Sequence, residues 1–218
     1  MLKPALPDFT SFQPISVEPE SFDSFLKNAL EDGDVWNTQL SRLSQPQLAL
    51  AGLDWKECLL ENCRLTGSSF QRSSFDQVLF KNCDLSGAKF TDCVFNKVVF
   101  EGCKLTGTLL FAAAFHQTIF TDCVAEYATF TKARAKGLWF EACTLTDARL
   151  DELSGKALGF DSCNLSRVSF QHTPLAGVDV SNSDIAGSLF TEKELRGLKV
   201  SPMQACELAK LLGIVISY

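Results

Sequence analysis

Cys83-Asp84-Leu85-Ser86-Gly87 is one copy of a five-residue unit that recurs along most of the 218-residue chain. The units twenty residues before and after it read Cys63-Arg64-Leu65-Thr66-Gly67 and Cys103-Lys104-Leu105-Thr106-Gly107. The cysteine returns at this interval six times in succession, at Cys63, Cys83, Cys103, Cys123, Cys143 and Cys163. Internal periodicity of this length predicts an architecture of repeats and takes precedence over local propensities.

A shorter period of five residues runs inside the period of twenty. From residue 50 to residue 200, 28 of the 31 positions spaced by five carry Leu, Phe, Ile, Val or Trp, and the exceptions are Ala125, Ala135 and Gly155. Two residues before each of these centres, 30 of 31 positions carry Ala, Cys, Ser, Thr, Val or Leu, and Lys193 is the exception. Inward positions separated alternately by two and three residues fit neither a helix nor a strand.

This spacing predicts a chain that runs extended, turns a corner and repeats. Four units close a square coil of twenty residues, and stacked coils pair their backbones at a spacing of about 4.8 Å. A corner two residues after each centre often requires a positive φ, which Gly and Asn tolerate. We expect such corners at Gly52, Asn62, Gly67, Asn82, Gly87, Gly102, Gly107, Gly177, Asn182, Gly187 and Gly197.

The quoted units resemble the A-[DN]-L-x-x consensus of pentapeptide-repeat proteins. This resemblance implies an all-β solenoid, a right-handed quadrilateral β-helix, over residues 48–200. We expect residues 1–47 to form an N-terminal cap and cover, with a short helix over residues 20–30 that ends near Asp32 and Gly33. Because one repeat scaffold serves many partners, the fold by itself does not identify the function.

Residues 201–218 are expected to form a separate C-terminal module. Ser201, Pro202 and Gln204 have the pattern of an N-cap, a first-turn proline and a capping-box glutamine, which predicts a helix to residue 212, a stop at Gly213 and an apolar strand over 214–216. This ending is similar to the C-terminus of the Qnr quinolone-resistance proteins and related gyrase-directed pentapeptide proteins, which implies an end-to-end homodimer; a simple end cap is the alternative. The expected dimerisation residues are Met203, Cys206, Leu208, Leu211, Leu212, Ile214 and Ile216.

The composition gives no sign of a membrane span, a catalytic centre or a metal site. No apolar run reaches the ~20 residues of a spanning helix, and the first residues lack the apolar core of a signal peptide, so we expect a cytoplasmic protein. Eight of the nine cysteines take inward positions, where a thiol is a small core side chain rather than a disulfide or zinc ligand. His116 and His172 fall on different faces of the predicted coil. We therefore expect no catalytic residue, no metal and no cofactor in a protein that is not an enzyme.

The outward residues differ in charge from face to face of the predicted coil. The acidic face, centred on residues 60, 80, 100, 120, 140, 160, 180 and 200, carries six acids against Lys81 and Lys199. The face before it in each coil, centred on residues 55 to 195, carries four acids against seven bases and is called the basic face. Since the coil region as a whole is almost neutral, scattered surface charge is an equal interpretation of this pattern. The six acids, called the acidic strip, are Glu61, Glu101, Asp122, Glu141, Asp161 and Asp179.

Pentapeptide-repeat proteins that act on DNA gyrase, the Qnr and MfpA-like group, are understood as mimics of duplex DNA. The resemblance to this group implies a homodimer that binds a type II topoisomerase, gyrase or topoisomerase IV, through the acidic strip and shields it from quinolones or natural gyrase toxins. It implies no direct binding of nucleic acid. The uninterrupted coil is more similar to loop-free relatives, which include immunity proteins against gyrase toxins. The alternative is a general protein-interaction scaffold whose partner is unrelated to DNA.

An apolar column accompanies the acidic strip, one residue before each of the first five centres of the acidic face. Its members are Leu59, Leu79, Val99, Ile119 and Trp139. All five are expected to point outward, and a contiguous apolar patch rarely stays bare on a soluble monomer. Two covers are open: the N-terminal segment, which we favour because it is rich in Phe and Leu, and a partner protein.

Overall fold

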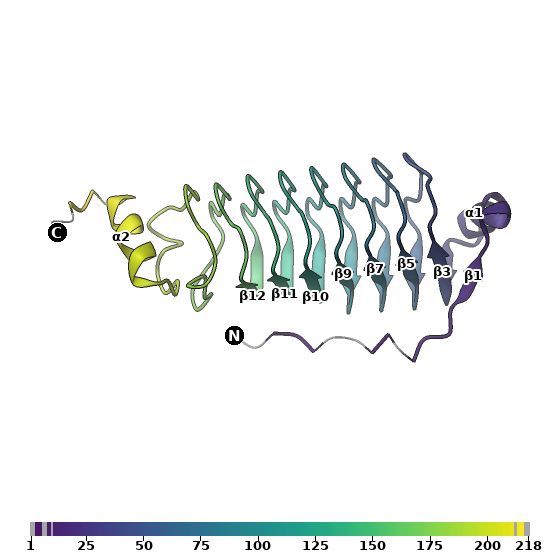
Figure 1. Ribbon diagram of the computed structural model, residues 1–218, viewed down its shortest axis with the longest axis horizontal. Helices are drawn as coiled ribbons and strands as arrows, with labels where there is room; N and C mark the ends of the chain where they lie inside the picture. The colour runs from purple at the N-terminus through teal and green to yellow at the C-terminus, as the bar shows by residue number, and fades with distance from the viewer. Residues whose placement is uncertain (1–2, 6–7, 10, 212, 216–218) are drawn as a thin grey trace.

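The computed structural model describes residues 3–5, 8–9, 11–211 and 213–215, and it forms a long rod of stacked coils with a helix at each end (Figure 1). Every strand pair is parallel, and neighbouring coils join residues twenty positions apart, as in Trp55↔Phe75 and Phe75↔Phe95. The predicted β-solenoid is therefore confirmed, with the coil length that the cysteine spacing indicates.

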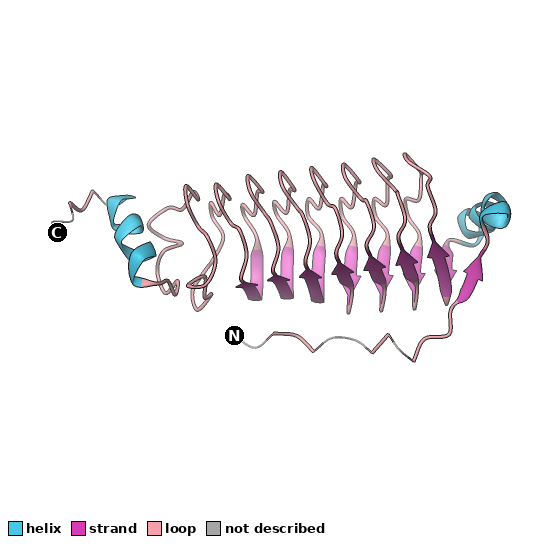
Figure 2. Cartoon of the chain, viewed as in Figure 1, coloured by secondary structure: helices cyan, strands magenta, loops and turns pink. Residues whose placement is uncertain are grey.

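The strands lie on only two of the four sides of the coil, the basic face and the acidic face (Figure 2). On the other two sides, adjacent coils are joined by isolated parallel bridges such as Arg64↔Asp84 and Ser69↔Lys89, separated by turn residues. The sequence predicts an extended stretch in every unit, so half of the units are more turn-like than expected. The basic-face strands are β2 (Asp34–Trp36), β4 (Asp54–Lys56), β6 (Ser74–Asp76) and β8 (Val94–Asn96); the acidic-face strands are β3 (Thr38–Ser41), β5 (Leu59–Glu61), β7 (Leu79–Lys81) and β9 (Val99–Glu101).

Three longer strands cross both of these faces without interruption. They are β10 (Ala114–Thr121), β11 (Arg134–Glu141) and β12 (Ser154–Asp161). At the N-terminal end a short strand, β1 (Ile15–Val17), pairs with β3. A single parallel sheet thus extends along the rod as far as β12 and sets the position of the outward side chains on this part of the acidic face.

The core is a set of aromatic ladders along the axis of the rod. The ring of Phe100 is fully buried and stacks on Phe80 and Phe120, with ring centroids 4.7 and 4.5 Å apart and interplanar angles of 3° and 1°. The small residues two positions before the centres fill the space between ladders, and their buried Ser and Thr hydroxyls and Cys thiols bond to backbone carbonyls. At some centres, such as Leu110 and Ala135, a leucine or an alanine replaces the ring, and these side chains are buried as well, so the apolar core continues from coil to coil.

The corner positions adopt the left-handed backbone conformation irrespective of residue type. Asn62 and Gly67 have φ of +55° and +67°, as predicted, but Arg72 at +59° and Tyr127 at +58° do the same without any intrinsic preference. Asn182, where the sequence predicts such a corner, does not have a positive φ, and residues 181–183 form a different turn.

The N-terminal end of the rod is closed by the helix α1 (Phe22–Asp32), which follows the single 3-10 turn η1 (Pro19–Ser21). Gly33, with φ of +80°, ends α1, and its N–H donates to the Ala29 carbonyl at 2.9 Å. The first coil starts directly after this glycine, since β2 and β3 pair with β4 and β5. Val35 and Leu40, which already fit the five-residue spacing of the centres, occupy inward, buried positions in this coil, ahead of residue 48.

The C-terminal end carries the helix α2 (Pro202–Leu211), and its predicted capping box is present. The Ser201 N–H donates to Gln204 Oε1 at 2.7 Å, and the Gln204 N–H donates to Ser201 Oγ at 3.3 Å. The Gln204 Nε2 amide also donates to the Val180 and Ser183 carbonyls, which fixes the helix to the last coils. Ile214 and Val215 do not form the expected strand, since they have no neighbouring strand to pair with; residues 212 and 216 lie outside the described residues.

Candidate protein-interaction surface

The acidic strip is only partly continuous on the folded rod. Successive registers of the sheet place one outward column along the acidic face, and it reads Glu61, Lys81, Glu101, Thr121, Glu141 and Asp161. The structure therefore brings four of the six expected acids into one column and interrupts them with a lysine and a threonine. Asp122 lies at the adjoining corner, and Asp179 lies in the coil that follows β12.

Several of these carboxylates have partners within the chain. Glu101 pairs with Lys81 at 3.4 Å, and Glu141 pairs with Lys3. Asp161 accepts hydrogen bonds from Asn182 Nδ2 at 2.5 Å and from Ser162 Oγ at 3.1 Å. In the part of the chain that the structure describes, the carboxylates of Glu61 and Asp122 form no ion pair. The negative potential of the strip is consequently weaker than the number of acids suggests.

The apolar column is largely covered. Leu59, Leu79 and Trp139 are partly buried, whereas Val99 is 4 % exposed and Ile119 has no exposed surface. The side chain of Ile119 lies on the outer side of β10, because its neighbours in the strand, Thr118 and Phe120, occupy the inward positions of the repeat. Atoms from outside the coil must therefore lie on top of it.

The segment that lies on this face comes from the start of the chain. We call residues 3–14, as far as they are described, the N-terminal strap; Figure 1 shows it running back from β1 alongside the coils toward β11. Lys3 reaches Glu141, and the Pro4 ring lies 3.6 Å from the position that a β-carbon on Gly137 would take. Sequence reasoning anticipated a cover from this region but did not identify Lys3, Pro4 or Gly137 as its contacts.

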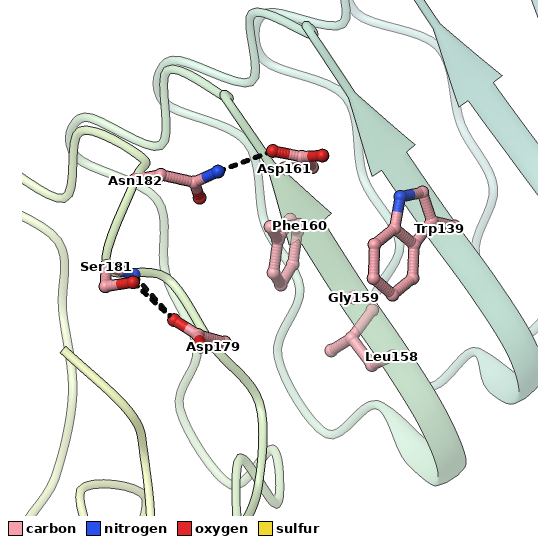
Figure 3. Close-up of a pocket in the computed structure, with 8 residues that line it drawn as sticks. All are labelled: Trp139, Leu158, Gly159, Phe160, Asp161, Asp179, Ser181 and Asn182. Carbon is pink, nitrogen blue, oxygen red and sulfur yellow. Dashed lines mark hydrogen bonds between the residues drawn. The ribbon is translucent and has the colours of Figure 1, made fainter. Parts of the chain in front are cut away.

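A cavity of about 300 Å³ opens where the apolar column ends (Figure 3). After Trp139 the next position in the column is Gly159, and the indole ring lies over this glycine. The carboxylates of Asp161 and Asp179 lie on the same cavity. Two hydrogen bonds to Asp179 from Ser181, from its hydroxyl at 2.6 Å and its N–H at 3.0 Å, lower the pKa of that carboxyl. The sequence analysis identified the two acids but not the cavity. The glycine that follows Trp139 in an otherwise apolar column could have indicated it.

The expected dimerisation residues form an exposed apolar end surface. Met203 is 83 % exposed, and Leu211 and Ile214 are more than half exposed. Leu208 packs against the core and Cys206 is partly buried. The expected residues Leu212 and Ile216 lie outside the described residues. Between α2 and the last coils there is a further cavity of about 500 Å³.

Among the described residues, no group of His, Cys, Asp and Glu is arranged to hold a metal ion, and no helix is long and apolar enough to cross a membrane. Eight cysteines are buried as free thiols. Burial raises the pKa of Cys58 to about 11 and of Cys93 to about 12, so neither thiol has the character of a nucleophile.

Two family profiles of repeat proteins match parts of this chain. The profile of pentapeptide repeats (8 copies) matches residues 49–82, and that of the pentapeptide repeat region matches residues 73–150. Among curated proteins no match was found.

Solved structures share the architecture. The rod is similar to two trypsin-treated variants of QnrB1, a plasmid-mediated fluoroquinolone resistance protein. One has 21% identity and a TM-score of 0.54 over 83% of this chain and 90% of that one; the other has 20% identity and a TM-score of 0.54 over 85% and 99%. HetL, a pentapeptide repeat protein involved in heterocyst differentiation regulation from the cyanobacterium Nostoc sp. strain PCC 7120, has 14% identity and a TM-score of 0.41 over 77% and 89%. The likeness to the two QnrB1 structures shows a common fold alone.

Proposed function

The chain belongs to the pentapeptide-repeat family, whose members are generally non-catalytic binding proteins, and from this premise we propose that it is a non-enzymatic protein that binds a type II topoisomerase. In this proposal the rod occupies the DNA-binding surface of gyrase or topoisomerase IV and shields the enzyme from a quinolone or a natural gyrase toxin. It needs no cofactor and contacts no nucleic acid.

The observation that carries the proposal is the column of acids along one side of a straight rod. Glu61, Glu101, Glu141 and Asp161 share one outward column of a parallel sheet, in which their carboxylates follow one another at intervals of two, two and one coils. A surface that binds duplex DNA is rich in Lys and Arg, and a rigid acidic rod is complementary to it. The similarity in fold to QnrB1 supports the same interpretation without establishing it.

The C-terminal module supports a homodimer. Met203, Leu211 and Ile214 expose apolar side chains at this end of the chain, and Met203 and Leu211 line the cavity behind α2. An apolar end surface of this kind is typical of a site that a second copy covers. We propose that Leu212 and Ile216 belong to the same contact. Two rods joined end to end would present their acidic faces over twice the length.

The test is a supercoiling assay in which the purified protein is titrated into gyrase, with and without a fluoroquinolone. We expect inhibition of supercoiling or relief of poisoning, and both effects should weaken as ionic strength rises. Glu61→Lys combined with Asp122→Lys reverses two acids of the strip that form no ion pair among the described residues, and it should weaken the effect roughly tenfold at low salt.

The matched control reverses two acids on the other sides of the rod. Asp92 is an exposed corner residue with φ of +58°, like Asp122 with +53°, and Glu126 is partly buried like Glu61. Asp92→Lys combined with Glu126→Lys changes the net charge equally and should leave the effect nearly intact. An equal loss in both double variants would show that net charge, rather than the acidic face, is responsible.

A second function is favoured by a different observation. Leu109, Phe111 and Tyr127 are 39, 38 and 60 % exposed, and all three lie on sides of the rod away from the acidic face. A general protein-interaction scaffold would use such apolar residues to dock a partner unrelated to DNA. Binding through them would persist at high salt, whereas binding through the acidic strip would fade.

A further inference from the structure

We propose that the N-terminal strap is a displaceable cover, which masks the acidic face in the isolated protein and leaves that face when a partner binds. The identity of the partner rests on the proposed function, but the strap and its release do not.

The strap is fixed near both of its ends and crosses the coils between them. At its start, Lys3 and Pro4 contact Glu141 and Gly137 of β11. At its end, the Ile15 N–H donates to the Asn37 carbonyl at 2.8 Å, where β1 joins β3. The coils of β9 and β10 lie between these two points along the rod (Figure 1).

The buried residues of the apolar column lie in those same coils. Val99 belongs to β9 and Ile119 to β10, and they are the two members of the column that the solvent does not reach. Phe9 and Phe12 of the strap are partly buried and pack edge to face, with ring centroids 5.3 Å apart. The strap crosses the rod at the coils in which Val99 and Ile119 are buried, so we assign the cover of these two side chains to the strap.

The strap is attached differently from the coils. Each coil forms backbone hydrogen bonds to the coils before and after it, whereas the described strap residues ahead of β1 form no strand, and the backbone bond from Phe12 to Phe9 stays within the strap. Among the described strap residues, the anchors on β11 are the Lys3–Glu141 ion pair, with about a third of each side chain exposed, and the Pro4 contact at Gly137. Exposed ion pairs contribute little, so the strap can leave without disrupting any coil.

Release changes the charge and the polarity of the face together. With the strap in place, the acidic face carries three cations, Lys3, Lys81 and Lys199, beside its six acids, and Lys3 forms an ion pair with Glu141. Without the strap, Glu141 is unpaired and Val99 and Ile119 are open. The uncovered face is therefore both more acidic and more apolar than the covered one, which suits a basic protein surface that also offers apolar contacts.

The test uses the full chain and reverses the anchoring charge. In Lys3→Glu the strap start is repelled by Glu141, whereas in the charge swap Lys3→Glu with Glu141→Lys the ion pair is restored. Lys27→Glu is the matched control, because Lys27 is an exposed lysine near the N-terminus that pairs with Glu31 on α1, away from the acidic face.

Two readouts require no partner. Thermolysin cleavage beside Phe9 and Phe12 should be about fivefold faster in Lys3→Glu, and ANS fluorescence should rise as Val99 and Ile119 become accessible. Both should return to the wild-type level in the charge swap and stay there in Lys27→Glu. Equal cleavage and equal ANS fluorescence in all variants, or a swap that restores neither, would overturn the assignment of the strap.

A third readout separates the strap from the proposed function. If the wild type inhibits gyrase, Lys3→Glu should do so at a concentration about fivefold lower, and Lys27→Glu, which changes the net charge equally, should match the wild type. Inhibition at the same concentration, in a variant whose strap is shown to be free, would overturn the masking role. If no variant affects gyrase, the proposed function falls, while cleavage and ANS still decide whether the strap is a displaceable cover.

Discussion

The indole ring of Trp139 occupies the space in which a β-carbon on Gly159 would lie, one coil further along the rod. The two residues are direct register partners in β11 and β12, and the inward neighbours Phe140 and Phe160 stack with ring centroids 5.4 Å apart. The outward tryptophan thus depends on the absence of a side chain at the next position of its column. This pair ends the apolar column and forms one wall of the acid-lined cavity.

Gly159→Ala should therefore destabilise the protein through a clash with Trp139. The φ of Gly159 lies outside the left-handed region, so the alanine meets no backbone strain and the effect reports packing alone. We expect a loss of about 1–3 kcal/mol in the free energy of unfolding, measured by urea titration. In a Trp139→Ala background the same substitution should be nearly neutral. An equal loss in both backgrounds would show that the ring is not the obstacle.

The aromatic ladders should make single core truncations costly. Phe100 is fully buried between Phe80 and Phe120, so Phe100→Ala removes two stacked contacts and leaves a cavity at the centre of the rod. We expect a loss of about 3–5 kcal/mol in urea unfolding. Phe111→Ala, at a position that is 38 % exposed, is the control and should cost less than about 1 kcal/mol. Similar losses for both would contradict the ladder as the main source of stability.

The repeat was sufficient to predict the coil, its core positions and the residues on each face. Prediction failed where a contact depends on two segments that share no period. Lys3 and Glu141 are 138 positions apart, and nothing in the spacing of either residue indicates the other. It also failed near the end of the solenoid, where Lys193 breaks the inward pattern and the buried residue is Glu194 instead. The period predicts the coils in the interior of a solenoid, where each coil has a neighbour on both sides. The end coils are exposed to solvent on one side, so local hydrogen bonds decide which of their residues are buried.

The thiols should be unreactive in the folded protein except for one. Eight of the nine cysteines are buried and Cys206 is partly exposed. With the pKa of Cys58 raised to about 11 by burial, only about a thousandth of that thiol is ionised at pH 8. Titration with DTNB at pH 8 should detect one fast thiol in the native protein and nine after denaturation. The fast thiol should disappear in Cys206→Ser, and several fast native thiols would contradict a closed core.

The apolar end surface should control the oligomeric state. Met203→Glu combined with Leu211→Glu introduces four like charges, two from each copy, into the proposed contact between the C-terminal helices. Sedimentation velocity should show a dimer for the wild type and a monomer for this variant. Leu30→Glu is the control, because Leu30 is a 49 % exposed leucine on α1 at the opposite end of the rod. A monomeric wild type would favour the simple end cap.

The buried carboxylate of Glu194 should make stability depend on pH in the acid range. Glu194 is 2 % exposed and accepts hydrogen bonds from the Thr191 N–H at 2.7 Å and from the Thr191 hydroxyl. Burial alone would raise the pKa of this carboxyl, but the hydrogen bonds from Thr191, together with those from the backbone of Glu194 and His172, outweigh it, and the pKa lies below its usual 4.5. Because the folded pKa is the lower one, the ionised group stabilises the fold above pH 4.5, and this contribution is lost as the pH falls through the folded pKa.

Glu194→Gln keeps the shape of the side chain and removes its charge. At pH 7 the variant should be less stable than the wild type by about 1 kcal/mol, the difference between a charged and a neutral acceptor. The gap should close as the pH is lowered from 5 toward 2, because the wild-type carboxyl then becomes neutral as well. Urea unfolding at several pH values measures this difference in the free energy of unfolding. Glu192→Gln, at an exposed position nearby, should have the same stability as the wild type at each pH. A difference that stays constant down to pH 2 would mean that the charge of Glu194 contributes nothing to the last coil.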